Sequence, residues 1–329
     1  MMTGMAEHYL VFLELRNGAI AKSSLDVWNR FQKFSSGRDS RVSAFAAGHA
    51  AEGAFDCLQG NGTVYHTDGT HFRTGCDSVV CAMIETLSGA ERVTGIAFAS
   101  TAMGRRLAAF LAGRLRAAFF SGCGGSGGVE KVCSRFIHSG TVIASYAAAA
   151  DMTIFLQGRE LPQPEFSSAE KPAIEAFDAT PYVVGGIHSL LVHAVSQSCQ
   201  KRDVAEASVV VAGGRGMGTR EAFGMLEELA ALLDGSVGAS RAAVDEGWRP
   251  HSYQIGQTGK RIAPDLYIAC GISGALQHLA GIRSARTVVA VNSDPDAPIF
   301  GAADYGIVGE VREVIPDLIG ILRDVMAKK

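Results

Sequence analysis

Short apolar runs alternate with amphipathic segments along most of the chain. In the first two thirds, the runs predict strands at Tyr9–Leu15, Arg41–Ala46, Val64–His66, Val93–Ala99, Thr141–Tyr146 and Met152–Gln157. Apolar residues at helical spacing predict helices at Ser24–Phe34, with Ser24 as the cap, and at Ser100–Leu115. The pair Asn17-Gly18 closes the first strand as a turn, and Trp28 is expected to lie in the core.

The pattern breaks up between Gln157 and about Lys201 and then resumes. Strands are predicted at Ser208–Ala212, Leu266–Cys270, Thr287–Asn292 and Tyr305–Val308, with helices at Arg220–Leu233 and Val314–Met326. A chain of 329 residues is long enough for two domains. We therefore predict an α/β fold with two domains, 1–203 and 204–329, each a doubly wound and mostly parallel sheet. The linker is expected near 199–207.

Composition narrows the classes of partner. The formal net charge is -3, and Lys and Arg are interspersed with acidic residues, so the sequence predicts no nucleic-acid partner. No apolar run approaches the ~20 residues that a membrane span requires, so no stable membrane insertion is expected. Seven cysteines without a C-x-x-C pair indicate a reducing compartment. Residues 1–8 lack the charged and apolar regions of a leader.

One glycine-rich stretch lies in the first domain, at 121–128. It is interpreted as a flexible surface loop. A phosphate cradle is the alternative, but no strand-loop-helix with a Lys-Ser/Thr pair follows it.

Four turns rich in small or polar residues stand out in the second domain: Gly213–Gly218, Gly238–Ala242, Gln254–Lys260 and Gly271–His278. Ligands of open α/β sheets bind outside the carboxyl ends of the strands, so these turns are where a site is expected. The first turn fails the dinucleotide spacing, because Thr219 stands where the third glycine belongs. The third turn is not a Walker loop, because Gln254 replaces its first glycine.

The side chains of these turns suit a large anionic planar cofactor. Arg215 is either a phosphate or ring contact or an ordinary surface arginine. His278, one turn into a short helix, is either a ligand contact or a structural histidine, and we favour contact. No nucleophile-base pair is evident, and the histidines show no metal-ligand spacing, so no metal is predicted.

Several blocks in the second domain resemble one family. These are Gly238–Asp245, Ile255–Lys260, Ala263–Ile268, Gly271–Gly281, Asp294–Phe300 and Ala303–Val308. In order and spacing they resemble the FAD domain of the electron transfer flavoprotein alpha subunit. The resemblance covers nearly all of 207–325 and extends more weakly through the first domain, mainly at Ala99–Ala109. It implies that the second domain is a Rossmann-like FAD-binding domain.

The resemblance also implies roles for individual residues. Thr258 would hydrogen-bond the flavin N5, His278 would lie by the flavin O2, and Arg241 would lie against the ring face. The other expected cofactor contacts are Arg215, Ser240, Ile255, Gly256, Gln257, Ser273, Gly274, Ala275, Leu276, Gln277, Asn292, Glu310 and Val311. Glu310 stands where the family usually carries aspartate, so its contact would be one methylene longer.

The resemblance implies an electron carrier without substrate turnover of its own. It would pair with a beta subunit that carries AMP. It would take electrons one at a time from flavin dehydrogenases of fatty-acid and amino-acid oxidation, such as acyl-CoA dehydrogenases. It would pass these electrons to a membrane quinone oxidoreductase. The expected location is the mitochondrial matrix, with a presequence absent or removed, or the bacterial cytoplasm. The loop at 121–128 and Phe155–Gly158, where the family has arginine-proline, depart from the family and lie in the domain expected to meet the beta subunit.

Three alternatives stay open at this point. A bifurcating version would have a beta partner with a second FAD in place of AMP. A nicotinamide-dependent oxidoreductase would use the second domain as an ordinary dinucleotide fold, but the failed fingerprint and the missing catalytic pair count against it. A scaffold that has lost its cofactor is disfavoured by the intact groups around Arg241, Thr258 and His278.

Overall fold

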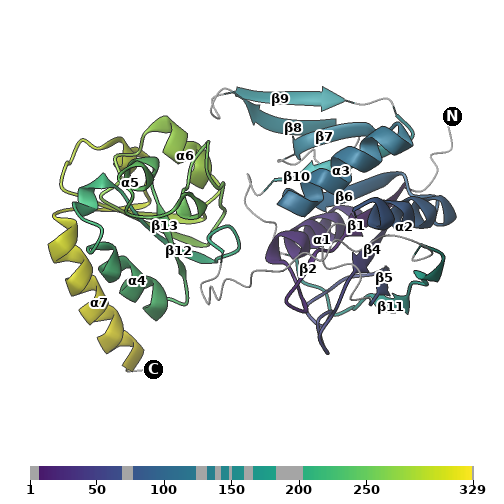
Figure 1. Cartoon of the computed structure of the whole chain (residues 1–329), viewed down its shortest axis with the longest axis horizontal. Helices are drawn as coiled ribbons and strands as arrows, with labels where there is room; N and C mark the ends of the chain where they lie inside the picture. Colours follow the sequence, from purple (N-terminus) through teal and green to yellow (C-terminus); the bar gives the residue numbers. More distant parts are fainter. Residues whose placement is uncertain are drawn as a thin grey trace. The chain divides into compact units, whose positions relative to one another are not determined.

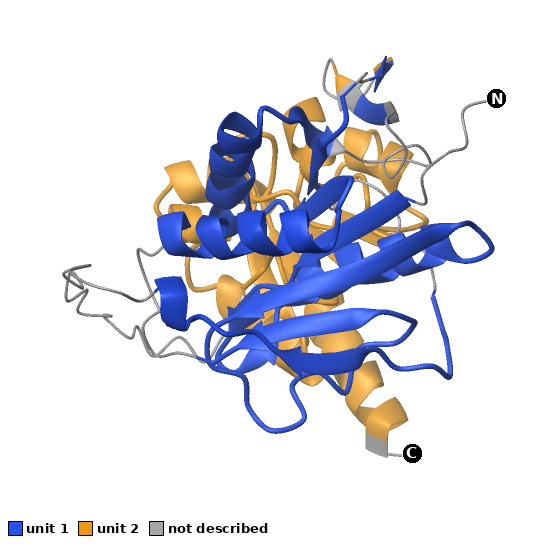
Figure 2. Ribbon diagram, turned by 90° about the vertical axis from the view of Figure 1, so that its right-hand side faces the viewer, with its two compact units in different colours: residues 1–136, 143–158, 163–195 blue, residues 137–142, 159–162, 196–329 orange. Residues whose placement is uncertain are grey.

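The computed structural model describes residues 7–68, 77–123, 132–137, 142–147, 150–158, 166–182 and 203–327. Contacts divide the chain into two compact units, with residues 1–136, 143–158 and 163–195 in one and residues 137–142, 159–162 and 196–329 in the other (Figure 2). Each unit has its own sheet and its own hydrophobic core. The boundary after residue 203 stays a prediction, because residues 183–202 lie outside the described part of the chain.

The first unit is built on a seven-stranded sheet in which all neighbouring strands are parallel. In spatial order the strands are β11 (Ala173–Ala176), β5 (Thr63–Thr67), β4 (Ser40–Ala47), β1 (Glu7–Phe12), β6 (Gly95–Ala99), β10 (Thr153–Gln157) and β7 (Ala118–Cys123). Helix α1 (Lys22–Ser35) contributes to one core cluster, and α2 (Asp77–Ala90) and α3 (Ala102–Leu115) contribute to another (Figure 1). Helices therefore cover both faces of the sheet, as parallel sheets require.

Two further two-stranded sheets are described. β2 (Leu15–Arg16) and β3 (Ala19–Ile20) form an antiparallel hairpin, and β8 (Val132–Ile137) pairs with β9 (Val142–Ala147). The hairpin of β2 and β3 corrects the prediction of a single strand through Leu15, because β1 ends at Phe12. Asn17 and Gly18 both have positive φ, 51° and 81°, so the predicted turn is confirmed as the loop of this hairpin.

Helix α1 confirms the prediction for Trp28, whose side chain is fully buried and whose Nε1 donates to the Gln59 carbonyl. The prediction that Ser24 caps the helix is wrong. The helix begins at Lys22, and the Ser24 hydroxyl accepts a hydrogen bond from the Glu14 N–H. A cap pattern alone does not reveal this, because serine bonds equally well to a backbone donor on a neighbouring segment.

The second unit is an open sheet of five parallel strands. In spatial order they are β13 (Ser236–Ala239), β12 (Val209–Gly213), β14 (Leu266–Cys270), β15 (Thr287–Asn292) and β16 (Tyr305–Val308). Helices α4 (Phe223–Leu232) and α7 (Val311–Ala327) lie together over one face (Figure 1). Ile282 of α6 (Leu276–Ile282) packs in a separate cluster, and the short α5 (Arg241–Asp245) follows β13.

The strand order has a direct bearing on function. From β12 the chain moves to β13 on one side and then returns to β14 on the other, so the direction of winding reverses between β12 and β14. This is the topological switch point at which open α/β sheets form a crevice outside the carboxyl ends of their strands. The predicted doubly wound architecture is therefore present, and it places the site at one edge of this sheet.

Several element predictions need correction or completion. In the first unit α2, β7, β8 and β11 were not predicted, and in the second unit β13 was not predicted. Helix α4 begins at Phe223 rather than Arg220, and α7 begins at Val311 rather than Val314. The predicted loop at 121–128 begins as strand, since β7 continues to Cys123, and its remaining residues lie outside the described part of the chain. Within the described residues, no helix is both long enough and apolar enough to cross a bilayer.

Candidate functional site

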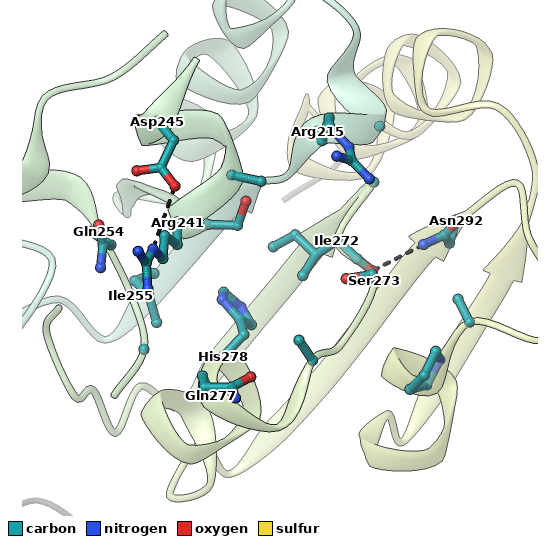
Figure 3. A pocket seen from close by; sticks show the side chains of 18 of the residues that line it. Arg215, Arg241, Asp245, Gln254, Ile255, Ile272, Ser273, Gln277, His278 and Asn292 are labelled. Carbon is teal, nitrogen blue, oxygen red and sulfur yellow. Dashed lines mark hydrogen bonds and ion pairs between the residues drawn. The ribbon is translucent and has the colours of Figure 1, made fainter. Parts of the chain in front are cut away.

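A cleft of about 560 Å³ opens at the carboxyl edge of the five-stranded sheet (Figure 3). Its walls come from the segments that follow β12, β13, β14 and β15, so it occupies the switch point. Twelve of the predicted cofactor contacts line it: Arg215, Ser240, Arg241, Ile255, Gly256, Gln257, Thr258, Ser273, Ala275, Gln277, His278 and Asn292. The volume falls in the range typical of small-molecule and cofactor sites.

The turn after β12 is held against the turn after β14 by backbone hydrogen bonds. The Gly214 N–H donates to the Cys270 carbonyl and the Gly216 N–H donates to the Gly271 carbonyl, each at 2.9 Å. A Cβ on Gly216 would lie 2.7 Å from the Gly271 Cα, so only glycine permits this approach. The close packing leaves the exposed Arg215 side chain at the cleft (Figure 3).

The segment after β13 contributes a second guanidinium. Ser240 caps α5, its hydroxyl accepting from the Ala243 N–H, and Arg241 follows as the first helical residue. The Arg241 Nε lies 3.4 Å from an Asp245 carboxylate oxygen, and the two side chains are 72% and 66% exposed. An ion pair with that exposure contributes little, about 0.3–0.5 kcal/mol, so the guanidinium can turn to an incoming ligand at small cost.

Thr258 lies on a tight loop, and its hydroxyl is hydrogen-bonded to a buried side chain. Gln254 is 4% exposed, and its Nε2 donates to the Thr258 Oγ1 at 2.9 Å. Gly256 has a φ of 144°, and the Gln257 N–H donates to the Gln277 carbonyl, which ties the loop to α6. The amide of Gln254 occupies one acceptor position of the hydroxyl and leaves its proton available for a ligand.

His278 is a second buried polar side chain of the cleft wall, after Gln254. It is 7% exposed, and its Nε2 lies 2.8 Å from the Tyr267 hydroxyl. Among the described residues its Nδ1 has no hydrogen-bond partner. Burial lowers the pKa of His278 from 6.5 to about 4, against a smaller opposing effect of the Ile255 backbone, so the ring is neutral near pH 7.

The segments after β14 and β15 are also linked. The Asn292 Nδ2 donates to the Ile272 carbonyl at 2.9 Å (Figure 3), and the Ile299 N–H donates to the Ser273 carbonyl. These bonds satisfy backbone carbonyls of the Gly271–Ala275 turn. The exposed hydroxyl of Ser273 therefore remains at the cleft surface.

Four predicted contacts do not line the cleft: Gly274, Leu276, Glu310 and Val311. Gly274 has a φ of 84° and packs against the backbone of Ile299, whereas Leu276 is 65% exposed. Val311, the first residue of α7, is 3% exposed and belongs to the core cluster to which α7 contributes. Glu310 is exposed and follows β16 at the same carboxyl edge, beyond the cleft itself.

Two polar residues with consequences for the site were missed by sequence reasoning. Gln254 supports Thr258, and Tyr267 supports His278. For Gln254 a signal existed, since it lies four residues before Thr258 in the same loop. No such signal existed for Tyr267. This residue lies in an apolar strand, eleven residues before His278, where an aromatic residue is expected to belong to the core.

Fold and site define the class of protein: an open α/β domain of Rossmann type whose switch-point cleft offers hydrogen-bond donors and two guanidiniums. A family model for the electron transfer flavoprotein FAD-binding domain matches residues 203–283. The chain is 32% identical to Protein FixB of Clostridium saccharobutylicum, over 96% of each chain. It is 38% identical to the electron transfer flavoprotein subunit alpha of Bacillus subtilis over 75% of each chain. The mitochondrial alpha subunit of Arabidopsis thaliana is 55% identical, over 38% of this chain and 34% of that protein.

The chain therefore belongs to the electron transfer flavoprotein alpha-subunit family, which is a family of electron carriers, and its cofactor is FAD. The residues of the cleft fit that cofactor. The buried Nδ1 of His278 lacks a partner in the described protein, and exposed donors surround an opening of suitable size. Among the described residues, no group of three or more His, Cys, Asp or Glu side chains could hold a metal ion.

Proposed function

We propose that this chain is the alpha subunit of a heterodimeric electron transfer flavoprotein whose beta subunit carries AMP. It accepts electrons one at a time from flavin dehydrogenases, including acyl-CoA dehydrogenases, and delivers them to a membrane quinone oxidoreductase. The observation that carries the proposal is the composition of the cleft, which combines arginine, hydroxyl, amide and imidazole groups without a nucleophile-base pair among its described lining residues. Such a site binds and tunes a cofactor rather than converting a substrate.

The proposed roles of individual residues follow from their placement. Thr258, exposed and held by Gln254, would donate to the flavin N5. The neutral His278 would contact the O2 edge, and the exposed Arg241 would lie against the ring and favour the negative charge that reduction adds. When bound, FAD supplies the electron-accepting ring system, while these residues set its position and its electrostatic surroundings.

The adenosine end of FAD would extend past the cleft along the carboxyl edge of the sheet. Glu310 follows β16 at that edge, and the Gly309 N–H donates to the Asn292 carbonyl, which joins this segment to the cleft wall. We propose that Glu310 and the adjacent backbone of Val311 contact the adenosine. Gly274 and Leu276 would act through the backbone of their turn.

The proposed cellular location is the mitochondrial matrix or the bacterial cytoplasm. Relatives named above come from bacteria, and one is named as mitochondrial. Both locations would bring the carrier to dehydrogenases of fatty-acid oxidation.

The test is to purify the chain with its beta partner, record the visible absorption spectrum, and count flavin and AMP per heterodimer. One FAD, one AMP and bleaching by a reduced acyl-CoA dehydrogenase are expected. Two FAD and no AMP would instead identify the bifurcating version, and a colourless complex would contradict the proposal. Ser273→Trp should block the cleft and remove the colour. Ser252→Trp, at an exposed position that does not line the cleft, is the matched control and should stay yellow.

A further inference from the structure

Tyr267 and His278 form a buried polar pair beneath the cleft. Tyr267 is the second residue of β14, its side chain is fully buried, and its hydroxyl is 2.8 Å from the His278 Nε2. His278 lies on the third residue of α6 and lines the cleft (Figure 3). The only hydrogen bond described for the Tyr267 side chain is the one to His278.

The protons of this pair can be counted. Burial raises the pKa of Tyr267 well above 10 and lowers that of His278 to about 4, so near pH 7 the phenol keeps its proton and the imidazole is neutral. A neutral imidazole carries one N–H, on either Nε2 or Nδ1. The choice between the two nitrogens is therefore set by the hydrogen bond to the hydroxyl.

If Nε2 carried the proton, it would donate to the phenol oxygen, and the buried phenol proton would have no acceptor among the described groups. The Nδ1 lone pair would be unsatisfied as well. If Nδ1 carries the proton, the phenol donates to Nε2 and only the Nδ1–H lacks a partner. Leaving one buried group unsatisfied instead of two favours this tautomer.

We propose that Tyr267 is a positioning residue that fixes the His278 proton on Nδ1, so that the imidazole presents this N–H to an acceptor of the bound cofactor. This rests on the proposed function, in that His278 must lie beside the FAD. The group that lacks a partner in the protein is then a donor, and the carbonyl edge of a flavin supplies an acceptor. Without the phenol, His278 can present either a donor or a lone pair, and the lone pair would repel a carbonyl oxygen.

The test uses the heterodimer loaded with FAD, with ¹⁵N-labelled histidine in the alpha subunit. The His278 signals are identified by their loss in His278→Ala, and the ¹⁵N shifts report which ring nitrogen carries the proton. We expect protonated Nδ1 and unprotonated Nε2 in the wild type. A protonated Nε2 in the yellow wild-type complex would overturn the inference and leave the proposed function standing. A complex without FAD would overturn both.

The Tyr267→Phe variant removes the hydroxyl and keeps the ring. We expect the proton to redistribute between the nitrogens and the FAD dissociation constant to rise about three- to tenfold, the value of one neutral hydrogen bond. Tyr305→Phe makes the same change at a 67% exposed position on β16 and should leave both unchanged.

A double variant separates positioning from packing. In the His278→Ala background, adding Tyr267→Phe should not weaken FAD binding further, because the hydroxyl acts only through the imidazole. An equal loss in both backgrounds, or a proton that stays on Nδ1 in Tyr267→Phe, would overturn the inference.

Discussion

The Arg241 guanidinium places a positive charge at the cleft, and its ion pair with Asp245 is weak. Its neighbour Asp245 lies 3.4 Å away, but both side chains are largely exposed, so solvent weakens their attraction. A bound cofactor that gains negative charge on reduction would compete favourably for the guanidinium. The charge is therefore best understood as available to the reduced cofactor.

Replacing Arg241 by Gln should lower the reduction potential of the bound FAD by on the order of 20–60 mV, because the reduced form loses more stabilisation than the oxidised form. Potentials are measured by equilibration with redox dyes of known potential. The control is Arg323→Gln, which removes an exposed guanidinium on α7 that pairs with Glu228 on α4, outside the cleft. Equal potentials in wild type and Arg241→Gln would contradict the role.

His278 should make stability depend on pH. Its folded-state pKa of about 4 lies below its ordinary value of 6.5, so between these values the unfolded chain binds a proton that the folded chain does not. Stability should thus be fully present above about pH 6.5 and fall as the pH is lowered towards 4, by at most about 1.4 kcal/mol per pH unit. His278→Asn should reduce the pH dependence of the free energy of unfolding measured in urea. His8, whose pKa is also lowered by burial, is present in both proteins, so the difference between them reports on His278. Parallel pH curves for the two proteins would refute the assignment.

At the scale of elements, the cleft depends on two turns that touch through their backbones. The turn after β12 approaches the turn after β14 so closely that Gly214 and Gly216 each meet Gly271. The sequence indicated that these glycines mark a site, because turns after parallel strands lie at one edge. The sequence did not indicate that the glycines of the two turns pack against each other, because that contact requires β12 and β14 to be neighbouring strands.

Gly216→Ala should displace the turn and weaken FAD binding at least tenfold, because the added Cβ would lie 2.7 Å from the Gly271 Cα. Gly224→Ala is the matched control. It lies in α4 with no atom within 4 Å of an added Cβ, and should stabilise the protein by about 0.4–1 kcal/mol. FAD titration and thermal unfolding of both variants measure the contrast. Tight FAD binding by Gly216→Ala would show that the turn is not part of the cofactor site.

At the scale of the whole molecule, the second unit has its own sheet and its own hydrophobic core, as an independently folding domain requires. Its sheet is packed by separate apolar clusters, one that includes α4 and α7 and one that includes Val204 and Ala207. These two residues precede β12 and are 4% and 2% exposed, so they belong to this unit's core. The proposed boundary after residue 203 therefore keeps both with the FAD-binding domain.

A fragment comprising 203–329 should fold cooperatively, with the helical and strand signals of an α/β protein in circular dichroism. A fragment comprising 209–329 loses Val204 and Ala207 and should be less stable by about 2–4 kcal/mol in urea unfolding. Equal stability of the two fragments would place the domain boundary later than proposed. An unfolded longer fragment would mean that the unit depends on the first domain.

Local chemistry in the sequence was enough for the alternation of strands and helices, the glycine turns, and the candidate positions Arg241 and His278. These features follow from periodicity and residue type, which act over a few neighbouring residues. Thr258 was indicated by the resemblance to the family. Boundaries were less predictable where a side chain had an unseen partner, as with Ser24, which bonds to Glu14 instead of capping its helix.

Tertiary structure alone decided which distant groups meet. Parallel pairing of β12 with β14 creates the switch point, and packing of α6 over the sheet brings His278 to the phenol of Tyr267. The physical reason is that burial, and hence hydrogen-bond satisfaction and pKa, depends on surroundings gathered from remote parts of the chain. The sequence by itself determined the chemical groups available to hold a cofactor, and the fold decided their protonation and their partners.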